Sequence, residues 1–286
     1  MDPKIVDLCE QYNNGLLDRR EFLKKLTLLA GGTTAAMALL PVLGNSYVKA
    51  QLVAKDDPRL DIEYIKYPAE TGDVQAYLAR PKGEEKLPGV IVIHENRGLQ
   101  PHIEDVTRRM ALEGFLAIAP DALSPLGGTP DDVDEARSLM RELDGQMTIK
   151  NFVAAVQYLK THPLSTGKVG CTGFCWGGGM TNQVAVHCTD LLAAVPYYGR
   201  QPLTEDVSKI KASLLLHYAG LDERINKGIP EFEKALKEAA VDYKIYIYEG
   251  AQHAFNNDTN TTRYHEEAAK LAWQRTIAFF KEKLKT

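Results

Sequence analysis

The chain has 286 residues, of which 44% are hydrophobic and 25% are charged, as in an ordinary globular protein. Its formal net charge is −4, and no basic stripe interleaves with aromatic residues, so the composition argues against a nucleic-acid partner. Four cysteines make no disulfide scaffold in a chain of this length, and no second Cys or His pair joins Cys171 and Cys175 to complete a zinc set. We therefore expect neither a metal nor another cofactor.

The first fifty residues have the order of an export leader. Residues 18–24 read Asp-Arg-Arg-Glu-Phe-Leu-Lys, which resembles a twin-arginine motif, and an uncharged run follows from Leu26 to Leu43. Residues 48–50 then place small side chains at the −3 and −1 positions of a cleavage site before Gln51. The sequence thus predicts a leader over 1–50, read by the twin-arginine export machinery, and one α/β domain over 51–286.

Two other interpretations of this segment stay open. The run from Leu26 to Leu43 reaches the length at which a helix can begin to span a membrane, although its glycines and threonines make it weakly apolar. It could also be an amphipathic helix at the start of the fold. Export predicts a periplasmic or otherwise exported protein, and the alternative location is cytoplasmic.

Beyond the leader, strand and helix patterns alternate along the chain. Alternating or continuous apolar runs predict strands at residues 61–67, 74–79, 89–94, 115–119, 168–172, 191–196, 213–217 and 243–248. Helical spacing predicts helices at residues 103–113, 131–143, 148–161, 180–188, 230–239 and 262–284. The first two strands are expected to pair as an antiparallel hairpin at a sheet edge. The remaining alternation predicts the α/β class, with a mostly parallel central sheet and helices on both faces.

A glycine-rich segment between the strand at 168–172 and the helix at 180–188 carries the strongest functional pattern. It reads Gly-Phe-Cys-Trp-Gly-Gly-Gly over 173–179, which is the G-x-nucleophile-x-G form of a nucleophile elbow with Cys175 as the nucleophile. A thiol at a helix N-terminus is favoured as thiolate by the helix dipole. The alternatives are a phosphate-binding turn and a tight turn with a buried cysteine.

A thiol nucleophile needs a base, and the base needs an orienting group. Asp222 follows the strand at 213–217, and His253 follows the strand at 243–248. Both loops are expected at the same edge of the sheet as Cys175, which is the edge where open α/β sheets bind ligands. His94 and His217 lie on buried strands and are interpreted as structural. The spacing thus predicts a Cys175–His253–Asp222 triad.

These motifs resemble the dienelactone hydrolase family of α/β-hydrolases. The resemblance covers essentially all of residues 55–286 and includes His-Glu-Asn-Arg-Gly at 94–98, Ala-Pro-Asp at 119–121, Tyr-Tyr-Gly at 197–199 and His-Ala-Phe at 253–255. It is nearest to bacterial members that carry a twin-arginine-like leader. The resemblance implies the α/β-hydrolase fold and hydrolysis of a carboxylic ester or lactone through an acyl-enzyme.

Roles for neighbouring residues follow. The N–H of Trp176 is expected in the oxyanion hole because it follows the nucleophile. The resemblance implies that the N–H of Asn96 is the second donor, and that Glu95 is the acidic residue that regulates the thiol. A salt bridge from Glu95 to Arg97 or to a nearby lysine is the alternative.

Substrate binding is assigned to Arg97, Tyr197 and Arg200, although the two arginines could be surface or ion-pair residues instead. The dienelactone-cleaving enzymes have an arginine shortly after the catalytic histidine, but this chain has Asn256 and Asn257 there. The expected substrate is a small-molecule ester or lactone, and whether dienelactone itself is cleaved stays open. The alternative functions are a non-catalytic or redox-sensing thiol protein on the same fold, and acyl transfer or amide cleavage with the same triad.

Overall fold

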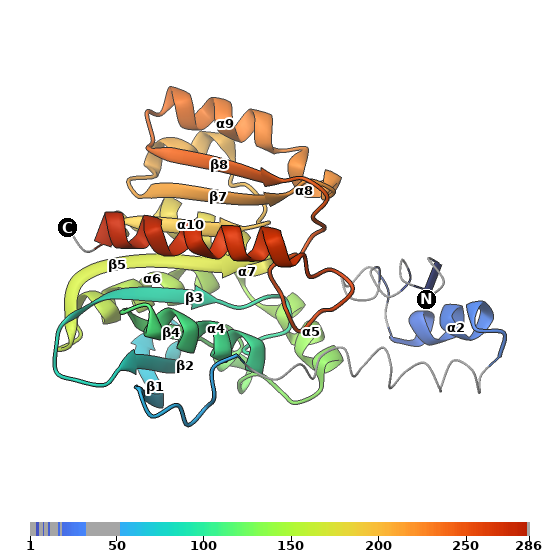
Figure 1. Cartoon of the computed structure of the whole chain (residues 1–286), viewed down its shortest axis with the longest axis horizontal. Coiled ribbons are helices and arrows are strands. Elements are labelled where there is room, and N and C mark those ends of the chain that lie inside the picture. The colour runs from blue at the N-terminus through green and yellow to red at the C-terminus, as the bar shows by residue number, and fades with distance from the viewer. Residues whose placement is uncertain are drawn as a thin grey trace.

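The computed structural model describes residues 52–284 without a gap, residues 19–32, and the isolated positions 4, 5, 8, 11 and 17. Its centre is one sheet of eight strands in the order β1-β2-β4-β3-β5-β6-β7-β8 (Figure 1). The strands are β1 (Leu60–Ala69), β2 (Gly72–Pro81), β3 (Leu87–Ile93), β4 (Leu116–Pro120), β5 (Ser165–Phe174), β6 (Ala193–Tyr197), β7 (Ser213–Ala219) and β8 (Tyr243–Tyr248).

The pairing pattern confirms the predicted fold class. β1 and β2 form an antiparallel hairpin at one edge of the sheet, and β2 also pairs antiparallel with β4. The other strands, from β4 through β3 to β8, are all parallel to their neighbours. Their carboxyl ends therefore meet at one edge, where the loops after β3, β5, β7 and β8 come together.

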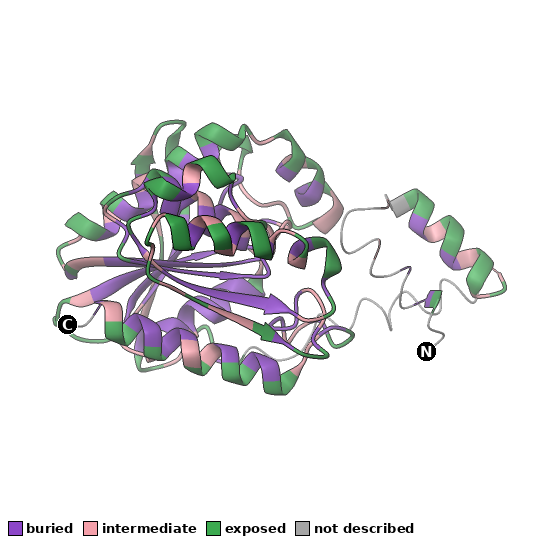
Figure 2. Cartoon of the chain, turned by 90° about the horizontal axis from the view of Figure 1, so that it is seen from above, coloured by how far each residue is buried: buried purple, intermediate pink, exposed green. Residues whose placement is uncertain are grey.

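Helices cover both faces of the sheet, and Figure 2 shows its buried strands between helices with exposed outer sides. The helices of this domain are α4 (Pro101–Leu112), α5 (Val133–Glu142), α6 (Gly145–Thr161), α7 (Trp176–His187), α8 (Glu223–Asn226), α9 (Ile229–Glu238) and α10 (Glu266–Leu284), with the 3-10 turns η2 (Ser124–Leu126) and η3 (Thr204–Lys209). Side chains of α5, α6, α7 and α9 pack in the core on one face. Those of α4 and α10 pack on the other.

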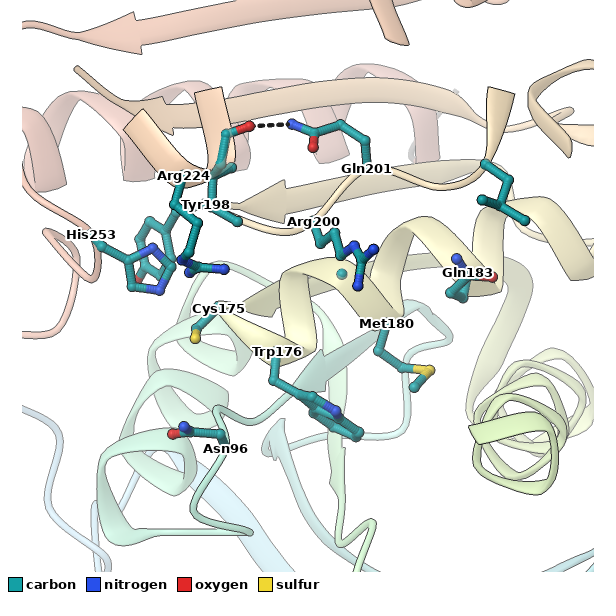
Figure 3. Close-up of a pocket in the computed structure, with 13 residues that line it drawn as sticks. Asn96, Cys175, Trp176, Met180, Gln183, Tyr198, Arg200, Gln201, Arg224 and His253 are labelled. Carbon is teal, nitrogen blue, oxygen red and sulfur yellow. Dashed lines mark hydrogen bonds between the residues drawn. The ribbon is translucent and has the colours of Figure 1, made fainter. Parts of the chain in front are cut away.

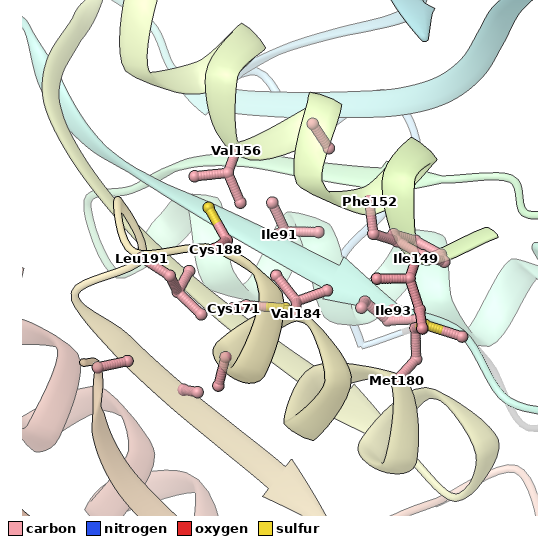
Figure 4. Packing of buried hydrophobic residues seen from close by; sticks show 14 of the residues in the cluster. Ile91, Ile93, Ile149, Phe152, Val156, Cys171, Met180, Val184, Cys188 and Leu191 are labelled. Atoms are coloured by element: carbon pink, nitrogen blue, oxygen red, sulfur yellow. The ribbon is translucent and has the colours of Figure 1, made fainter. Parts of the chain in front are cut away.

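The β3 strand is apolar on both sides because both of its faces are covered. Ile91 and Ile93 pack with residues of α6 and α7, as Figure 4 shows, whereas Val90 and Val92 belong to the core on the opposite face. All four side chains are fully buried. This core fixes the ends of the strands from which the functional loops start.

The elements differ from the sequence predictions in several places. The helix after the elbow begins at Trp176, four residues before the predicted start, because the glycines that lower helix propensity here also permit the close packing of its first turn. The C-terminal helix begins at Glu266 rather than at residue 262. The single-turn helix α8 after Asp222 was not predicted, since four residues are too few to give a periodic pattern.

The predicted leader is described only in part. The paired arginines begin the helix α2 (Arg19–Leu29), where Phe22 and Leu26 pack with Ile5 and Leu8. Within the described residues, no helix has both the length and the apolar character required to cross a bilayer. Most of the uncharged run and the cleavage site at 48–50 fall outside the described residues. Export and the domain boundary at residue 50 therefore stay predictions.

Candidate active site

Cys175 stands in a tight turn between β5 and α7. Its backbone has φ 56° and ψ −112°, a conformation that side-chain-bearing residues rarely adopt and that costs of order 1–3 kcal/mol. The Cys175 N–H donates to the carbonyl oxygen of Tyr197 at 3.1 Å, which ties the turn to the neighbouring strand. A Cβ atom on Gly173 would lie 2.3 Å from the Gly177 oxygen, so a larger residue would force the turn open. The strained turn is thus specified by its glycines and by strand pairing.

Asp222 begins α8 at the end of the β7 strand. Its Oδ1 accepts the N–H of Ile225 at 3.3 Å, so the carboxylate also serves as the helix cap. The preceding residue, Leu221, donates its N–H to the carbonyl oxygen of Ala251 at 2.9 Å. The loop that carries the acid is therefore bonded to the loop that carries His253.

The structure brings His253 and Asp222 into direct contact. Nδ1 of His253 donates to Oδ2 of Asp222, and the two side chains are only 11% and 6% exposed. Burial disfavours the charged imidazole, but the negative Cys175 sulfur and the hydrogen bond to Asp222 outweigh it and raise the pKa of His253 to about 9. Burial also opposes the charge on Asp222, yet the hydrogen bond and charge of His253, helped by Arg224, lower the pKa of this carboxyl. The pair is therefore favoured in its charged form.

The other imidazole nitrogen is available for chemistry. Within the described residues, the buried Nε2 of His253 has no hydrogen-bond partner, although the Cys175 sulfur is near enough to influence its pKa. In Figure 3 the half-buried Cys175 side chain extends from the elbow toward the side of the cavity where Asn96 lies. Catalytic hydrogen bonds are often long without substrate. Because Nδ1 is engaged with Asp222, Nε2 is the nitrogen that can hold the proton taken from the Cys175 thiol.

The predicted oxyanion donors, Trp176 and Asn96, line the same cavity as Cys175. Trp176 is the first residue of α7, so its N–H has no acceptor within the helix. Its ring stacks on His94 with centroids 5.4 Å apart. Nδ1 of His94 donates to the carbonyl oxygen of Glu95 at 2.6 Å, and Nε2 accepts the N–H of Ala122 at 3.1 Å. Burial lowers the pKa of His94, so the neutral ring shapes the loop that presents Asn96.

A cavity of about 530 Å³ opens at this edge of the sheet. Cys175 and His253 lie at one end of it, and the Gln183 side chain of α7 lies toward the other (Figure 3). The wall is apolar at Trp176, Met180, Leu203 and Ile225, and polar at Asn96, Gln183, Tyr198, Arg200, Gln201 and Arg224. Such a volume suits a small organic molecule with an apolar part and a polar part.

The substrate-binding predictions have mixed outcomes. Arg200 lines the cavity as predicted. Arg97 lies in the loop after β3 but is not among the residues that line this cavity. The assignment of Tyr197 is wrong, because its fully buried ring lies in the core and its hydroxyl bonds to the Thr276 hydroxyl at 2.6 Å. As the last residue of β6, Tyr197 faces the core, and the chain reaches the cavity only at the next residue, Tyr198.

Glu95 contacts an amide rather than a basic group. Its Oε2 accepts from Nδ2 of Asn257 at 2.9 Å. Over residues 52–284 and the described leader positions, no Arg or Lys forms an ion pair with Glu95, so the salt-bridge alternative is wrong there. Its role toward the thiol stays a prediction.

Tyr198 and Arg224 are among the lining residues that the sequence did not predict. Tyr198 has φ 39°, is 1% exposed, and packs its ring against His253 with centroids 5.0 Å apart. Arg224 is exposed at the cavity wall, two residues after Asp222. The position of Arg224, two residues after Asp222, could have indicated that it lies at the cavity. Nothing in the sequence distinguished Tyr198 from Tyr197 as a lining residue.

Comparisons with known proteins agree with this geometry. A sequence model described as the dienelactone hydrolase family matches residues 74–284. The chain belongs to the dienelactone hydrolase family. An Escherichia coli K12 protein named "Putative carboxymethylenebutenolidase" is 33% identical over 83% of this chain and 93% of its own length. The predicted family and the class of carboxylic ester hydrolase are thereby confirmed.

Solved structures of this family share the fold. The Klebsiella pneumoniae structure described as "Putative Dienelactone Hydrolase" has a TM-score of 0.70 and 31% identity, covering 78% of this chain and 99% of its own. The dienelactone hydrolase of Anabaena variabilis has a TM-score of 0.63 at 21% identity, over 79% of this chain and 99% of its own, and shows likeness of fold alone. The α/β-hydrolase fold is therefore confirmed.

Proposed function

We propose that this family member hydrolyses a small carboxylic ester or lactone through a Cys175–His253–Asp222 triad. The observation that carries the proposal is the contact between His253 and Asp222, which leaves Nε2 free at the cavity end where Cys175 stands. A rotation of the cysteine side chain about its Cα–Cβ bond would direct the sulfur at Nε2. We take the reaction class from the family and the mechanism from the triad.

In the first half-reaction the proton of the Cys175 thiol is held on Nε2 of His253, and the thiolate attacks the substrate carbonyl. The negative charge on the carbonyl oxygen is held by the N–H groups of Trp176 and Asn96, and the loss of one such donor typically costs about 100- to 1,000-fold in rate. The imidazolium then gives its proton to the leaving alcohol, and a thioester on Cys175 remains.

In the second half-reaction His253 takes a proton from water, and the hydroxide attacks the thioester. Collapse of this intermediate breaks the carbon–sulfur bond, returns the proton to the sulfur and releases the acid. Asp222 holds the tautomer that these steps require and balances the positive charge on the imidazole. In a lactone the alcohol and the acid stay in one product.

The polar wall supports a narrower substrate class. Arg200 and Arg224 line the cavity, and in the described residues neither forms an ion pair. Guanidinium groups bind carboxylates with paired hydrogen bonds. We infer that they bind a negatively charged group of the substrate, while the apolar wall at Trp176 and Met180 takes its hydrocarbon part.

The Cys175→Ala variant tests the triad. We expect turnover of p-nitrophenyl acetate to fall by about 10⁴-fold or more, because removal of the nucleophile disables the whole unit. Cys188→Ala is the matched control, since this buried thiol lies in the core at the end of α7 and should leave the rate unchanged. Unchanged turnover in Cys175→Ala would remove the cysteine from the mechanism. If labelling of Cys175 then persists without turnover, the thiol-sensing alternative is favoured.

A further inference from the structure

Two loops that are far apart in the sheet are joined by one side-chain hydrogen bond. His253 follows β8 and Asn96 follows β3, and three strands separate β8 from β3 in the sheet. Between these loops, Nδ2 of Asn257 donates to Oε2 of Glu95 at 2.9 Å, across 162 positions of sequence. The loop of the general base is thereby bonded to the loop of the predicted oxyanion donor.

The orientation of the Asn257 amide is fixed by its other contacts. Its Oδ1 accepts from the N–H of Thr259 at 3.0 Å and from the Thr259 hydroxyl at 2.6 Å. Its own N–H donates to the carbonyl oxygen of Ala254 at 3.0 Å, and the residue is 5% exposed. With the oxygen occupied by two donors, the NH₂ group must face Glu95. An N–H donor favours the charged form of a carboxylate.

The next residue, Asp258, makes a second connection on the same side. Its Oδ2 accepts from Arg109 at 2.7 Å, and its Oδ1 lies 3.3 Å from Nδ1 of His102. Both partners belong to α4, the helix that follows the Asn96 loop. Burial opposes the charge on Asp258, but these partners outweigh it and lower its pKa to about 2. Asp258 is therefore charged and engaged with α4, whereas Asn257 contacts Glu95.

Glu95 acts electrostatically on two titratable groups. His94 of the same loop is neutral because burial lowers its pKa. Tyr198 follows β6, and burial together with the charges of Glu95 and Cys175 raises its pKa well above the usual value. The hydrogen bond from the Asn257 amide is the contact that joins the Glu95 side chain to the histidine loop.

We propose that Asn257 is a positioning residue that holds the histidine loop and the oxyanion loop in register through Glu95. The inference rests on the proposed function, because it takes His253 as the base and Asn96 as a donor. A small change in the separation of these two groups is costly, since misplacement by about 1 Å can lower a rate by about 100-fold. The Asn257 amide is neutral and already hydrogen-bonded, so we assign the binding of anionic groups to Arg200 and Arg224.

The Asn257→Asp variant replaces the NH₂ donor of this contact by an acceptor oxygen while the side chain keeps nearly the same shape. The new Oδ1 keeps both bonds from Thr259, but the second oxygen faces the Glu95 carboxylate, and the two carboxylates repel each other when both are ionised. We expect kcat for p-nitrophenyl acetate to fall by about 10- to 100-fold at pH 8, with KM little changed. The loss should shrink relative to the unchanged protein as the pH is lowered, because the pair can then share a proton.

The double variant Glu95→Gln with Asn257→Asp restores a donor and an acceptor with their places exchanged. It should recover most of the rate at pH 8, and its pH profile should follow that of the unchanged protein. Thermal unfolding of all variants is measured alongside, because a purely structural residue would lower stability without a pH-dependent kcat.

Outcomes for this inference and for the proposed mechanism can be told apart. A normal rate for Asn257→Asp at pH 8, or a double variant as slow as the single one, overturns the positioning role even if Cys175→Ala is inactive. Full turnover by Cys175→Ala overturns the triad whatever the Asn257 variants do. If Asn257→Asp does not fold, the comparison is made with Asn257→Ala, which should lose kcat at every pH without the recovery at low pH. A normal kcat in that variant also overturns the positioning role.

Discussion

The catalytic pair and the two arginines of the cavity wall are held differently. Asp222 and His253 are almost completely buried, bonded to each other and held by backbone hydrogen bonds between their loops. Arg200 and Arg224 are exposed on the wall, Arg224 close to the catalytic pair, and within the described residues they have no ion-pair partner. Substitutions in the buried pair should therefore lower kcat, whereas substitutions of the wall arginines should change KM and substrate preference.

The largest effect that tests this division is expected from Asp222→Asn. An amide at this place can no longer accept the Nδ1 proton as a charged group, so the imidazole is free to adopt the wrong tautomer. We expect kcat to fall by about 10³- to 10⁴-fold. Asp190→Asn is the matched control, because this exposed carboxylate pairs with Lys160 and does not line the cavity. A variant at residue 222 with a near-normal kcat would show that the acid does not orient the base.

A smaller effect is expected for the arginines of the cavity wall. Arg200→Ala and Arg224→Ala should each raise KM for an ester with a free carboxylate by about 10-fold, which is the loss of about one charge-assisted hydrogen bond. The same variants should leave KM for p-nitrophenyl acetate nearly unchanged. Arg141→Ala serves as the control, since this exposed arginine lies on α5, outside the cavity wall. Equal losses for charged and neutral esters would mean that these side chains shape the cavity rather than select charge.

The sequence was informative wherever a pattern is fixed by backbone geometry. Continuous apolar strands, the glycines around Cys175 and the placement of Asp222 and His253 after parallel strands sufficed to predict the fold and the contact of the acid with the histidine. Periodicity cannot say where a strand ends to within one residue, and this is why Tyr197 was assigned in place of Tyr198.

Contacts between distant loops were beyond the reach of sequence. The hydrogen bond from Asn257 to Glu95 joins segments that are 162 positions apart, and neither sequence motif indicates which residue the other will contact. The sequence showed only that an amide stands where an arginine was expected. Arg224 belongs to a one-turn helix too short to be predicted, so only its position two residues after Asp222 indicated that it lies near the cavity.

The protonation of His253 also has a consequence for stability. A folded-state pKa of about 9, above the ordinary value of 6.5, means that the folded protein binds this proton more tightly than the unfolded chain does. The contribution is therefore fully present below pH 6.5 and is lost as the pH rises through about 9. It depends on the negative sulfur beside the ring, so it should be smaller when Cys175 is replaced.

The most direct measurement of the convergence of these groups is an NMR titration of His253 with ring-labelled histidine. The unchanged protein should titrate at about pH 9, and Cys175→Ala should titrate lower, because burial lowers this pKa once the sulfur no longer opposes it. Cys188→Ala should titrate like the unchanged protein. If His253 titrates identically with and without the Cys175 sulfur, the two groups do not interact, and the account of a cysteine activated by this histidine is contradicted.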